Sequence, residues 1–274
     1  MFEDPGTARS AAWVRCFDAI FERRLRRAFH AVRVSRPRPT VVAAHAPLVV
    51  YCNHPSWWDA ALMPVLLARL FPQREAFGPI DADALARYRF MRRLGFFGVE
   101  RDSYAGAATF LRTGRRVLAS PHALLGVTPQ GGFGDPRRRP VRLRPGLAAL
   151  IARVPRVTVL PIAIEYPFWD ERLPEALVRL GDPMAMGRLE SGSAPDVRGT
   201  LERELARTMD ALAEDAMSRD PARFATLIEG RAGVGGIYDG WRRLRAWRAG
   251  VHFDPAHRPT QPAMRRRGGE GRAG

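Results

Sequence analysis

One short segment of the 274-residue sequence combines the residue types of a general base. An apolar run, 48–52, is followed by Asn53, the only asparagine of the chain, and by His54, and Asp59 comes five positions after His54. Such a run predicts a buried strand, and polar groups at the carboxyl end of a strand in an open α/β sheet stand where ligands usually bind. A histidine there, with a carboxylate one turn away to hold its tautomer and stabilise its charged form, can remove a proton from a substrate hydroxyl.

Asp59 has a second interpretation, because Ser56-x-x-Asp59 is the pattern of a helix capping box. In that interpretation Ser56 caps the helix and Asp59 reaches back to the chain before it. A serine-based triad is disfavoured, since Ser56 lies outside a Gly-x-Ser-x-Gly turn and is better explained as the cap. Cys52 and His54 have no second ligand pair at a suitable spacing, so we expect no metal site.

Strand-like and helix-like segments alternate along the chain around this motif. Apolar, β-branched runs predict buried strands, and apolar side chains at three- and four-residue intervals predict helices. The alternation predicts an α/β fold with a mostly parallel central sheet flanked by helices. The expected strands are 40–43 with 48–52, 124–127 and 157–164, and the expected helices are 56–70, one that ends at 115–119, 147–153 and 197–217.

The first 39 residues predict an amphipathic helix and a linker. Apolar side chains recur at helical spacing from Ala8 to Val34 with arginines between them, and an Arg/Pro linker, Ser35 to Pro39, follows. A basic amphipathic helix with aromatic residues is typical of segments that lie on anionic membranes. The same apolar stripe is typical of a helix that packs on the body of its own protein, and both interpretations stay open.

The net charge of +16 comes from arginine alone, because all 44 basic residues are arginine. Without lysine, the chain cannot provide a P-loop lysine, a Schiff base or a protein-kinase ion pair. The excess gathers at the ends, with 9 arginines against 4 acids in residues 1–50 and 9 against 3 in residues 237–274, where arginines alternate with Trp241, Leu244 and Trp247. Zinc-finger spacing, an aromatic RNA-binding signature and a clear helix-turn-helix are missing, so we expect no nucleic-acid partner.

Cysteine usage favours a reducing compartment, and hydropathy gives no sign of a membrane span. Cys16 and Cys52 do not form the framework of a disulfide-stapled protein. The sequence opens without a signal-peptide pattern, and no window reaches the ~18 uninterrupted apolar residues of a membrane span. We therefore expect neither secretion nor a helix that crosses the bilayer.

Five blocks of the sequence, in order, resemble those of the glycerolipid acyltransferase superfamily, typified by bacterial 1-acylglycerol-3-phosphate acyltransferases. His54 and Asp59 match its first signature, Asn-His-x-x-x-x-Asp. The second block is similar to Gly95–Arg101, whose closing arginine the family associates with the phosphate of the acceptor. The remaining blocks resemble Thr128-Pro129-Gln130-Gly131-Gly132 with its downstream partner Arg144-Pro145-Gly146, the proline-containing apolar run 157–164, and the run 178–183 that ends in Gly-x-Pro. The resemblance covers about residues 40–215.

The third block departs from the family pattern Phe-Pro-Glu-Gly-Thr-Arg. Gln130 stands for the glutamate, Gly132 for the threonine and Phe133 for the arginine. Replacing the arginine removes a bidentate phosphate contact and leaves apolar surface, which puts an acceptor phosphate held in the standard way in doubt. Gln130 still offers a donor and an acceptor to a hydroxyl-bearing head group. The arginine run 137–139 is a second source of charge or a solvated stretch.

The resemblance implies a membrane-associated O-acyltransferase of phospholipid biosynthesis. His54 would remove the proton from an acceptor hydroxyl, Asp59 would orient it, and the acyl group would come from acyl-CoA or acyl-ACP without a cofactor. Arg101, Gln130, Gly131 and Gly132 are the expected substrate-binding residues. The amides of Gly131 and Gly132, or those of the helix start after Pro55, are candidate oxyanion donors, and a tight turn that needs a positive φ is the other explanation of the two glycines.

This interpretation divides the chain into a basic N-terminal helix and linker (1–39), a phospholipid/glycerol acyltransferase domain (40–217), a C-terminal helical extension (218–253) and a disordered basic tail (254–274). The expected partners are an anionic membrane surface, acyl carrier protein or a CoA thioester, and a lysophospholipid-like acceptor, at the cytoplasmic face of the inner membrane. Two alternatives remain: the same chemistry on a lyso-ornithine lipid, a glycolipid or a terpenoid alcohol, and a non-catalytic lipid-binding relative. The sequence does not indicate an oligomeric state.

Overall fold

A computed structural model describes residues 5–39, 46–188 and 193–232, together with 244, 245, 247, 248 and 250. Its centre is a mixed sheet with one short strand, β8 (Met184–Met186), paired to β6 off the main path. Across the sheet, the order is β4 (Phe96–Val99), β3 (Glu75–Asp81), β5 (Ala123–Val127), β2 (Leu48–Cys52), β6 (Val157–Glu165), β7 (Glu175–Leu180), β1 (Ala31–Ser35) and β9 (Phe224–Glu229).

The strands from β4 to β6 are all parallel to their neighbours, as the sequence predicted. The remaining part of the sheet is mixed, because β7 is antiparallel to β6, β1 is parallel to β7 and β9 is antiparallel to β1. The carboxyl ends of the five parallel strands therefore meet at one edge, which is the usual place of a ligand site in an open α/β sheet.

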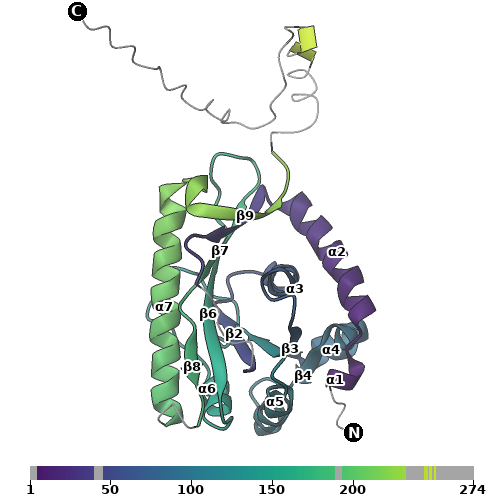
Figure 1. Ribbon diagram of the computed structural model, residues 1–274, viewed down its shortest axis with the longest axis vertical. Helices are drawn as coiled ribbons and strands as arrows, with labels where there is room; N and C mark the ends of the chain where they lie inside the picture. The colour runs from purple at the N-terminus through teal and green to yellow at the C-terminus, as the bar shows by residue number, and fades with distance from the viewer. Residues whose placement is uncertain are drawn as a thin grey trace, which may run out of the picture.

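Helices cover both faces of the sheet, and Figure 1 shows α7 and α2 on its opposite flanks. One face packs against α5 (Tyr104–Val117), α6 (Pro145–Ile151) and α7 (Ala194–Ser218), and the other against α2 (Ala11–Ala28) and α3 (Asp59–Leu70). The short helices are α1 (Pro5–Ala8), α4 (Ala82–Arg87), η1 (Arg89–Leu94) and η2 (Pro221–Arg223).

Apolar patterning explains the central strand β2 and the long helix α7. All five residues of β2 are fully buried, since this strand lies in the middle of the sheet with helices on both sides. The helix predicted at 197–217 is α7, and its stripe, which includes Leu201, Leu205 and Leu212, is buried against the sheet.

The N-terminal helix is shorter than the sequence predicted. It ends at Ala28, and Phe29 adopts an extended conformation that leads into β1, so that Val32 and Val34 belong to a strand. Both valines are buried in the sheet, where β-branched side chains pack well. The prediction for 40–43 and those for the C-terminal tail lie outside the described residues. Within the described part of the chain, no helix has the length and apolarity needed to cross a membrane.

Candidate active site

His54 and Asp59 form a hydrogen-bonded pair at the carboxyl edge of the sheet. His54 follows β2, and Asp59 is the first residue of α3, which brings Nδ1 of the imidazole within 2.6 Å of Oδ2 of the carboxylate. Asp59 is 2% exposed, whereas the His54 side chain is 23% exposed. Because Nδ1 is occupied by Asp59, Nε2 is the nitrogen that is left to take a proton from a substrate.

Asp59 serves both interpretations that the sequence left open. Its Oδ2 also accepts a hydrogen bond from the Ser56 amide at 3.2 Å, as in a capping box. The Ser56 hydroxyl accepts a bond from the Trp58 amide at 3.3 Å within the turn before α3, but it does not cap the helix as predicted, because α3 begins at Asp59 and its N-cap residue is Trp58. One carboxylate oxygen thus holds both the turn before α3 and the imidazole of His54.

Tyr166 also binds Asp59, and it was not predicted from the sequence. Its hydroxyl donates to Oδ1 of Asp59 at 2.5 Å, and burial raises the pKa of Tyr166 well above its usual value, which keeps this donor protonated. Tyr166 follows β6, the strand beside β2, and so lies at the same edge of the sheet as His54. That position is the signal that could have indicated it.

The main chain of His54 is held from two sides by the segment after β5. Its amide donates to Oε1 of Gln130 at 3.0 Å, and its carbonyl accepts from the Gly134 amide at 3.0 Å. Phe133, between them, lays its ring against the imidazole with 4.4 Å between the ring centroids. Gln130, predicted to bind substrate, therefore lies beside the general-base candidate, and its side chain contacts the backbone of His54.

The two glycines of the third block differ in their surroundings. Gly131 has a φ of +76°, and its amide donates to the Thr128 carbonyl at 3.2 Å, which fits the tight-turn interpretation and occupies that N–H. A Cβ on Gly131 would lie 2.1 Å from Nε of Arg144, so the glycine lets this guanidinium cross the turn. Around a Cβ on Gly132, by contrast, no heavy atom lies within 4 Å.

Arg101 lies at the same edge of the sheet, three strands away from His54. That separation corresponds to about 14 Å at the usual strand spacing. Its Nε donates to Oδ2 of Asp81 at 2.6 Å, and its side chain is 62% exposed. Arg144, which resembles the basic residue of the Lys-x-Gly partner, pairs with Asp102 at 2.7 Å. Both guanidinium groups near the predicted phosphate position thus already have a carboxylate partner.

The arginine run 137–139 is exposed and makes local or surface pairs. Arg137 binds Asp135 through two nitrogens, at 2.9 and 2.7 Å, and Arg139 binds Asp210 on α7 at 2.5 Å. These contacts favour the solvated interpretation of the run over a site for a substrate phosphate.

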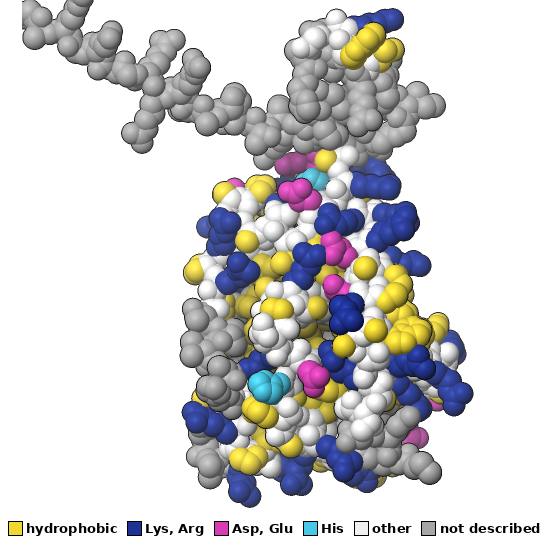
Figure 2. Space-filling view, turned by 45° about the vertical axis from the view of Figure 1, so that its right-hand side comes forward, with side chains coloured by type: hydrophobic (Ala, Val, Ile, Leu, Met, Phe, Trp, Pro, Cys, Tyr) yellow, Lys and Arg dark blue, Asp and Glu magenta, His cyan; other side chains and the backbone are white. Residues whose placement is uncertain are grey.

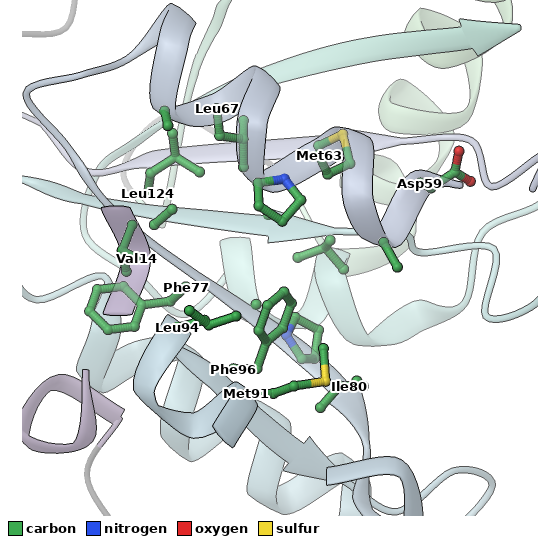
Figure 3. Close-up of a pocket in the computed structure, with 18 of the residues that line it drawn as sticks. Val14, Asp59, Met63, Leu67, Phe77, Ile80, Met91, Leu94, Phe96 and Leu124 are labelled. Carbon is green, nitrogen blue, oxygen red and sulfur yellow. The ribbon is translucent and has the colours of Figure 1, made fainter. Parts of the chain in front are cut away.

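An apolar cavity of about 240 Å³ begins at the His54–Asp59 pair. Figure 3 shows Asp59 at one end and Val14 at the other, with Met63 and Leu67 of α3 on one side and Phe96 on the other. Most of its lining side chains are apolar, and α2 contributes Val14 together with the rings of Phe17 and Phe21, so the N-terminal helix forms part of its wall. The cavity has the shape and the apolar lining that a hydrocarbon chain requires.

Comparison with known proteins identifies the central part of the chain. Residues 31–165 match the family model described as Acyltransferase, and they contain His54, Asp59 and Gln130. This segment belongs to the glycerolipid acyltransferase superfamily. A similar solved structure is that of the 1-acyl-sn-glycerophosphate (LPA) acyltransferase PlsC from Thermotoga maritima, which is 15% identical with a TM-score of 0.49, over 73% of this chain and 79% of that one. No curated protein matches the sequence significantly.

Among the residues that the structure describes, no three His, Cys, Asp or Glu side chains are grouped so that they could hold a metal ion. The cysteine next to the site, Cys52, is buried, and burial raises the pKa of its thiol well above the usual value, so that it stays a neutral wall residue.

Proposed function

We propose that this acyltransferase transfers a fatty acyl group from a thioester to a hydroxyl of a lysophospholipid-like acceptor at a membrane surface. The observation that carries the proposal is the His54–Asp59 pair at the mouth of an apolar cavity. Such an arrangement offers a proton acceptor beside a place for the hydrocarbon chain, which are the two requirements of acyl transfer to an alcohol.

In the proposed reaction, Nε2 of His54 takes the proton from the acceptor hydroxyl as its oxygen attacks the carbonyl carbon of the thioester. The carbon–sulfur bond then breaks, the new ester bond remains, and the imidazolium returns the proton to the thiolate that leaves. Asp59 stabilises the charge on the imidazolium and keeps Nε2 directed outward through its bond to Nδ1. The protein needs no covalent intermediate for this sequence.

The cavity supports a long-chain acyl donor. Each methylene group that moves from water into apolar surroundings contributes about 0.8 kcal/mol, so a lining of Met63, Leu67, Phe77 and Leu94 favours fatty acyl groups over short ones. Acyl carrier protein is acidic and CoA carries phosphates, and a chain with a net charge of +16 attracts either of them.

The acceptor has a second candidate class, favoured by the surface beside His54. Phe133, whose ring is exposed, stands where the family that this chain resembles has an arginine. Arg101 and Arg144 are paired with carboxylates. This surface suits an acceptor whose reacting end carries no phosphate, such as a glycolipid, a lyso-ornithine lipid or a terpenoid alcohol.

Membrane association at the cytoplasmic face of the inner membrane is part of the proposal. One side of α2 packs on the domain through Leu25 and Phe21, while Ile20 is 42% exposed on the same helix. Figure 2 shows arginine side chains interspersed with hydrophobic ones on this flank of the molecule. Near the C-terminus, Leu244 and Trp247 are exposed as well. Such mixtures of basic and apolar side chains bind anionic lipid surfaces.

The experiment is an acyl-transfer assay with purified protein, acyl-CoA or acyl-ACP, and vesicles that contain either lysophosphatidic acid or a neutral lyso-lipid. We expect His54→Ala to lower kcat about 100-fold, a general base's ordinary share of catalysis. His122→Ala, on an exposed histidine just before β5 at the opposite edge of the sheet, is the control and should retain full activity. Equal activity of His54→Ala and the parent protein would overturn the proposal in favour of the non-catalytic lipid-binding alternative.

A further inference from the structure

The carboxylate of Asp59 is held at both of its oxygens. Oδ2 accepts from His54 at 2.6 Å and from the Ser56 amide, and Oδ1 accepts from the Tyr166 hydroxyl at 2.5 Å. Asp59 is 2% exposed, so water contributes little to its solvation. A buried carboxylate that lost the Tyr166 bond would keep one oxygen without a partner and would be freer to rotate about its χ2 angle.

The Tyr166 ring packs against Phe29, which in turn packs against Trp58. Its centroid lies 5.3 Å from that of Phe29, and the Phe29 ring lies 5.2 Å from that of Trp58 in an edge-on arrangement. Phe29 is 1% exposed and caps the carboxyl end of α2, and Trp58 directly precedes Asp59. Because Phe29 is buried and also contacts Trp58, it gives the Tyr166 ring a rigid support from which the hydroxyl reaches Asp59.

Tyr166 lies one residue beyond the segment that matches the acyltransferase family model, 31–165. It reaches Asp59 from a position 107 residues later in the chain. Resting on the acyl-transfer function proposed above, we propose that Tyr166 is a positioning residue: its hydroxyl fixes the carboxylate of Asp59, and the carboxylate in turn fixes His54 with Nε2 toward the acceptor. Tyr166 acts through Asp59 and does not itself touch the reacting atoms.

The test compares Tyr166→Phe with Tyr51→Phe, the same substitution at another buried tyrosine. Tyr51 is fully buried and donates to the Leu201 carbonyl at 3.1 Å, away from the His54–Asp59 pair. Tyr51→Phe therefore reports the cost of losing a buried phenol hydrogen bond alone. We expect Tyr166→Phe to lower kcat about 10-fold with the KM for both substrates nearly unchanged, as for a lost bond to a charged group. Tyr51→Phe should keep its kcat.

A double-mutant cycle with Asp59→Asn separates positioning from general damage to the fold. If Tyr166 acts only through the carboxylate, then Tyr166→Phe should add no further loss in the Asp59→Asn background. A wild-type kcat in Tyr166→Phe, or a loss that multiplies in full with that of Asp59→Asn, would overturn the proposal.

A measurement without substrate keeps this inference distinct from the proposed function. The proton on Nδ1 of His54 gives a downfield NMR signal when it is held in a short bond to a carboxylate. We expect this signal to shift or broaden in Tyr166→Phe and to stay in place in Tyr51→Phe, because only the former frees the Asp59 carboxylate. An unchanged signal in Tyr166→Phe would contradict the positioning role, whereas inactivity of the parent protein with every thioester would contradict the proposed function alone.

Discussion

The ring of Phe133 lies against the imidazole of His54, with 4.4 Å between the centroids and 46° between the ring planes. Phe133 is 65% exposed, so one of its faces covers the histidine while much of the ring remains open to an approaching acceptor. An apolar surface directly beside the base favours the non-polar part of an acceptor and gives no charge that could pair with a phosphate.

Restoring the arginine should therefore change the acceptor preference. We expect Phe133→Arg to raise kcat/KM for lysophosphatidic acid relative to a neutral lyso-lipid by about 10-fold, because a guanidinium can bind phosphate through two bonds. The ratio is measured in mixed-acceptor assays on the same vesicles. Phe168→Arg, at a phenylalanine that is 67% exposed, adds the same charge elsewhere and should leave the ratio unchanged. An equal change in both variants would assign the effect to net charge alone.

Gln130 should be replaceable by glutamate but not by leucine. Its contact with His54 uses only the carbonyl oxygen Oε1, which accepts from the amide of His54, and a glutamate oxygen can accept the same bond. We expect Gln130→Glu to keep kcat within about threefold, and Gln130→Leu to lose about 10-fold as the amide of His54 is left without its partner. Steady-state kinetics checks both values, and similar losses in the two variants would contradict the backbone-holding role.

Alanine substitution should destabilise the protein at Gly131 and have little effect at the neighbouring Gly132. Gly131 adopts a φ of +76° and leaves no room for a Cβ beside Arg144, whereas the space around Gly132 is open. We expect Gly131→Ala to lower the free energy of unfolding by about 1–3 kcal/mol and Gly132→Ala to change it by less than about 0.5 kcal/mol. Urea denaturation measures both, and equal stabilities would show that Arg144 moves aside without cost.

The sequence predicted the elements whose local residue pattern matches their surroundings. It missed the elements whose structure depends on contacts with residues far away in the chain. β2 is apolar throughout because helices cover both faces of the central sheet, so its pattern was visible. β1 contains Arg33, whose charge is neutralised inside the sheet by Glu175 at 2.9 Å, and the arginine made this strand look like the continuation of a basic helix. β3 contains Pro79, which local rules count against a strand.

The residues around His54 and Asp59 show the same difference between local and distant contacts. His54 and Asp59 were predicted because their spacing is short, and the helix start between them brings the two side chains together. Tyr166 was not predicted because its partner lies 107 residues earlier, and only the neighbouring positions of β2 and β6 in the sheet bring the two together. The contact of Phe133 with His54 likewise depends on the bond from the Gly134 amide to the His54 carbonyl, which no local pattern shows.

Narrowing the cavity at Gly126 should shift the preferred acyl donor toward shorter chains. A Cβ at Gly126 would meet Cδ1 of Leu67 at 3.3 Å, and both residues line the cavity. We expect Gly126→Val to lower the ratio of kcat/KM for long-chain over medium-chain acyl-CoA about 10-fold, the usual cost of overfilling a packed apolar site. Gly146→Ala, where the new methyl would make ordinary contact with Phe110 outside the cavity, is the control. Uniform loss at all chain lengths would show that the cavity does not hold the acyl chain.

Asp18 and Glu22, one turn apart on α2, should affect stability with opposite signs. Burial raises the pKa of Asp18, although Arg69 opposes this and Glu22 adds to it, and its Oδ1 has no hydrogen-bond partner among the described residues. A raised folded-state pKa means that ionisation costs stability at neutral pH and that the cost disappears below the unfolded value of about 3.9. We expect Asp18→Asn to raise Tm at pH 7 by about 1–3 °C and to leave it unchanged near pH 3.5.

Glu22 provides the matched comparison for Asp18. Burial acts to raise the pKa of Glu22, but the hydrogen bonds from Arg26 and Arg69 outweigh it and lower the pKa. Its ionised form therefore contributes stability above the unfolded value of about 4.3, and that contribution is lost as the pH falls through the lower folded-state pKa. Glu22→Gln should thus lower Tm at pH 7 under the conditions in which Asp18→Asn raises it. Thermal unfolding of both variants across pH 3 to 7 checks the pair, and shifts of the same sign at pH 7 would contradict this assignment of charges along α2.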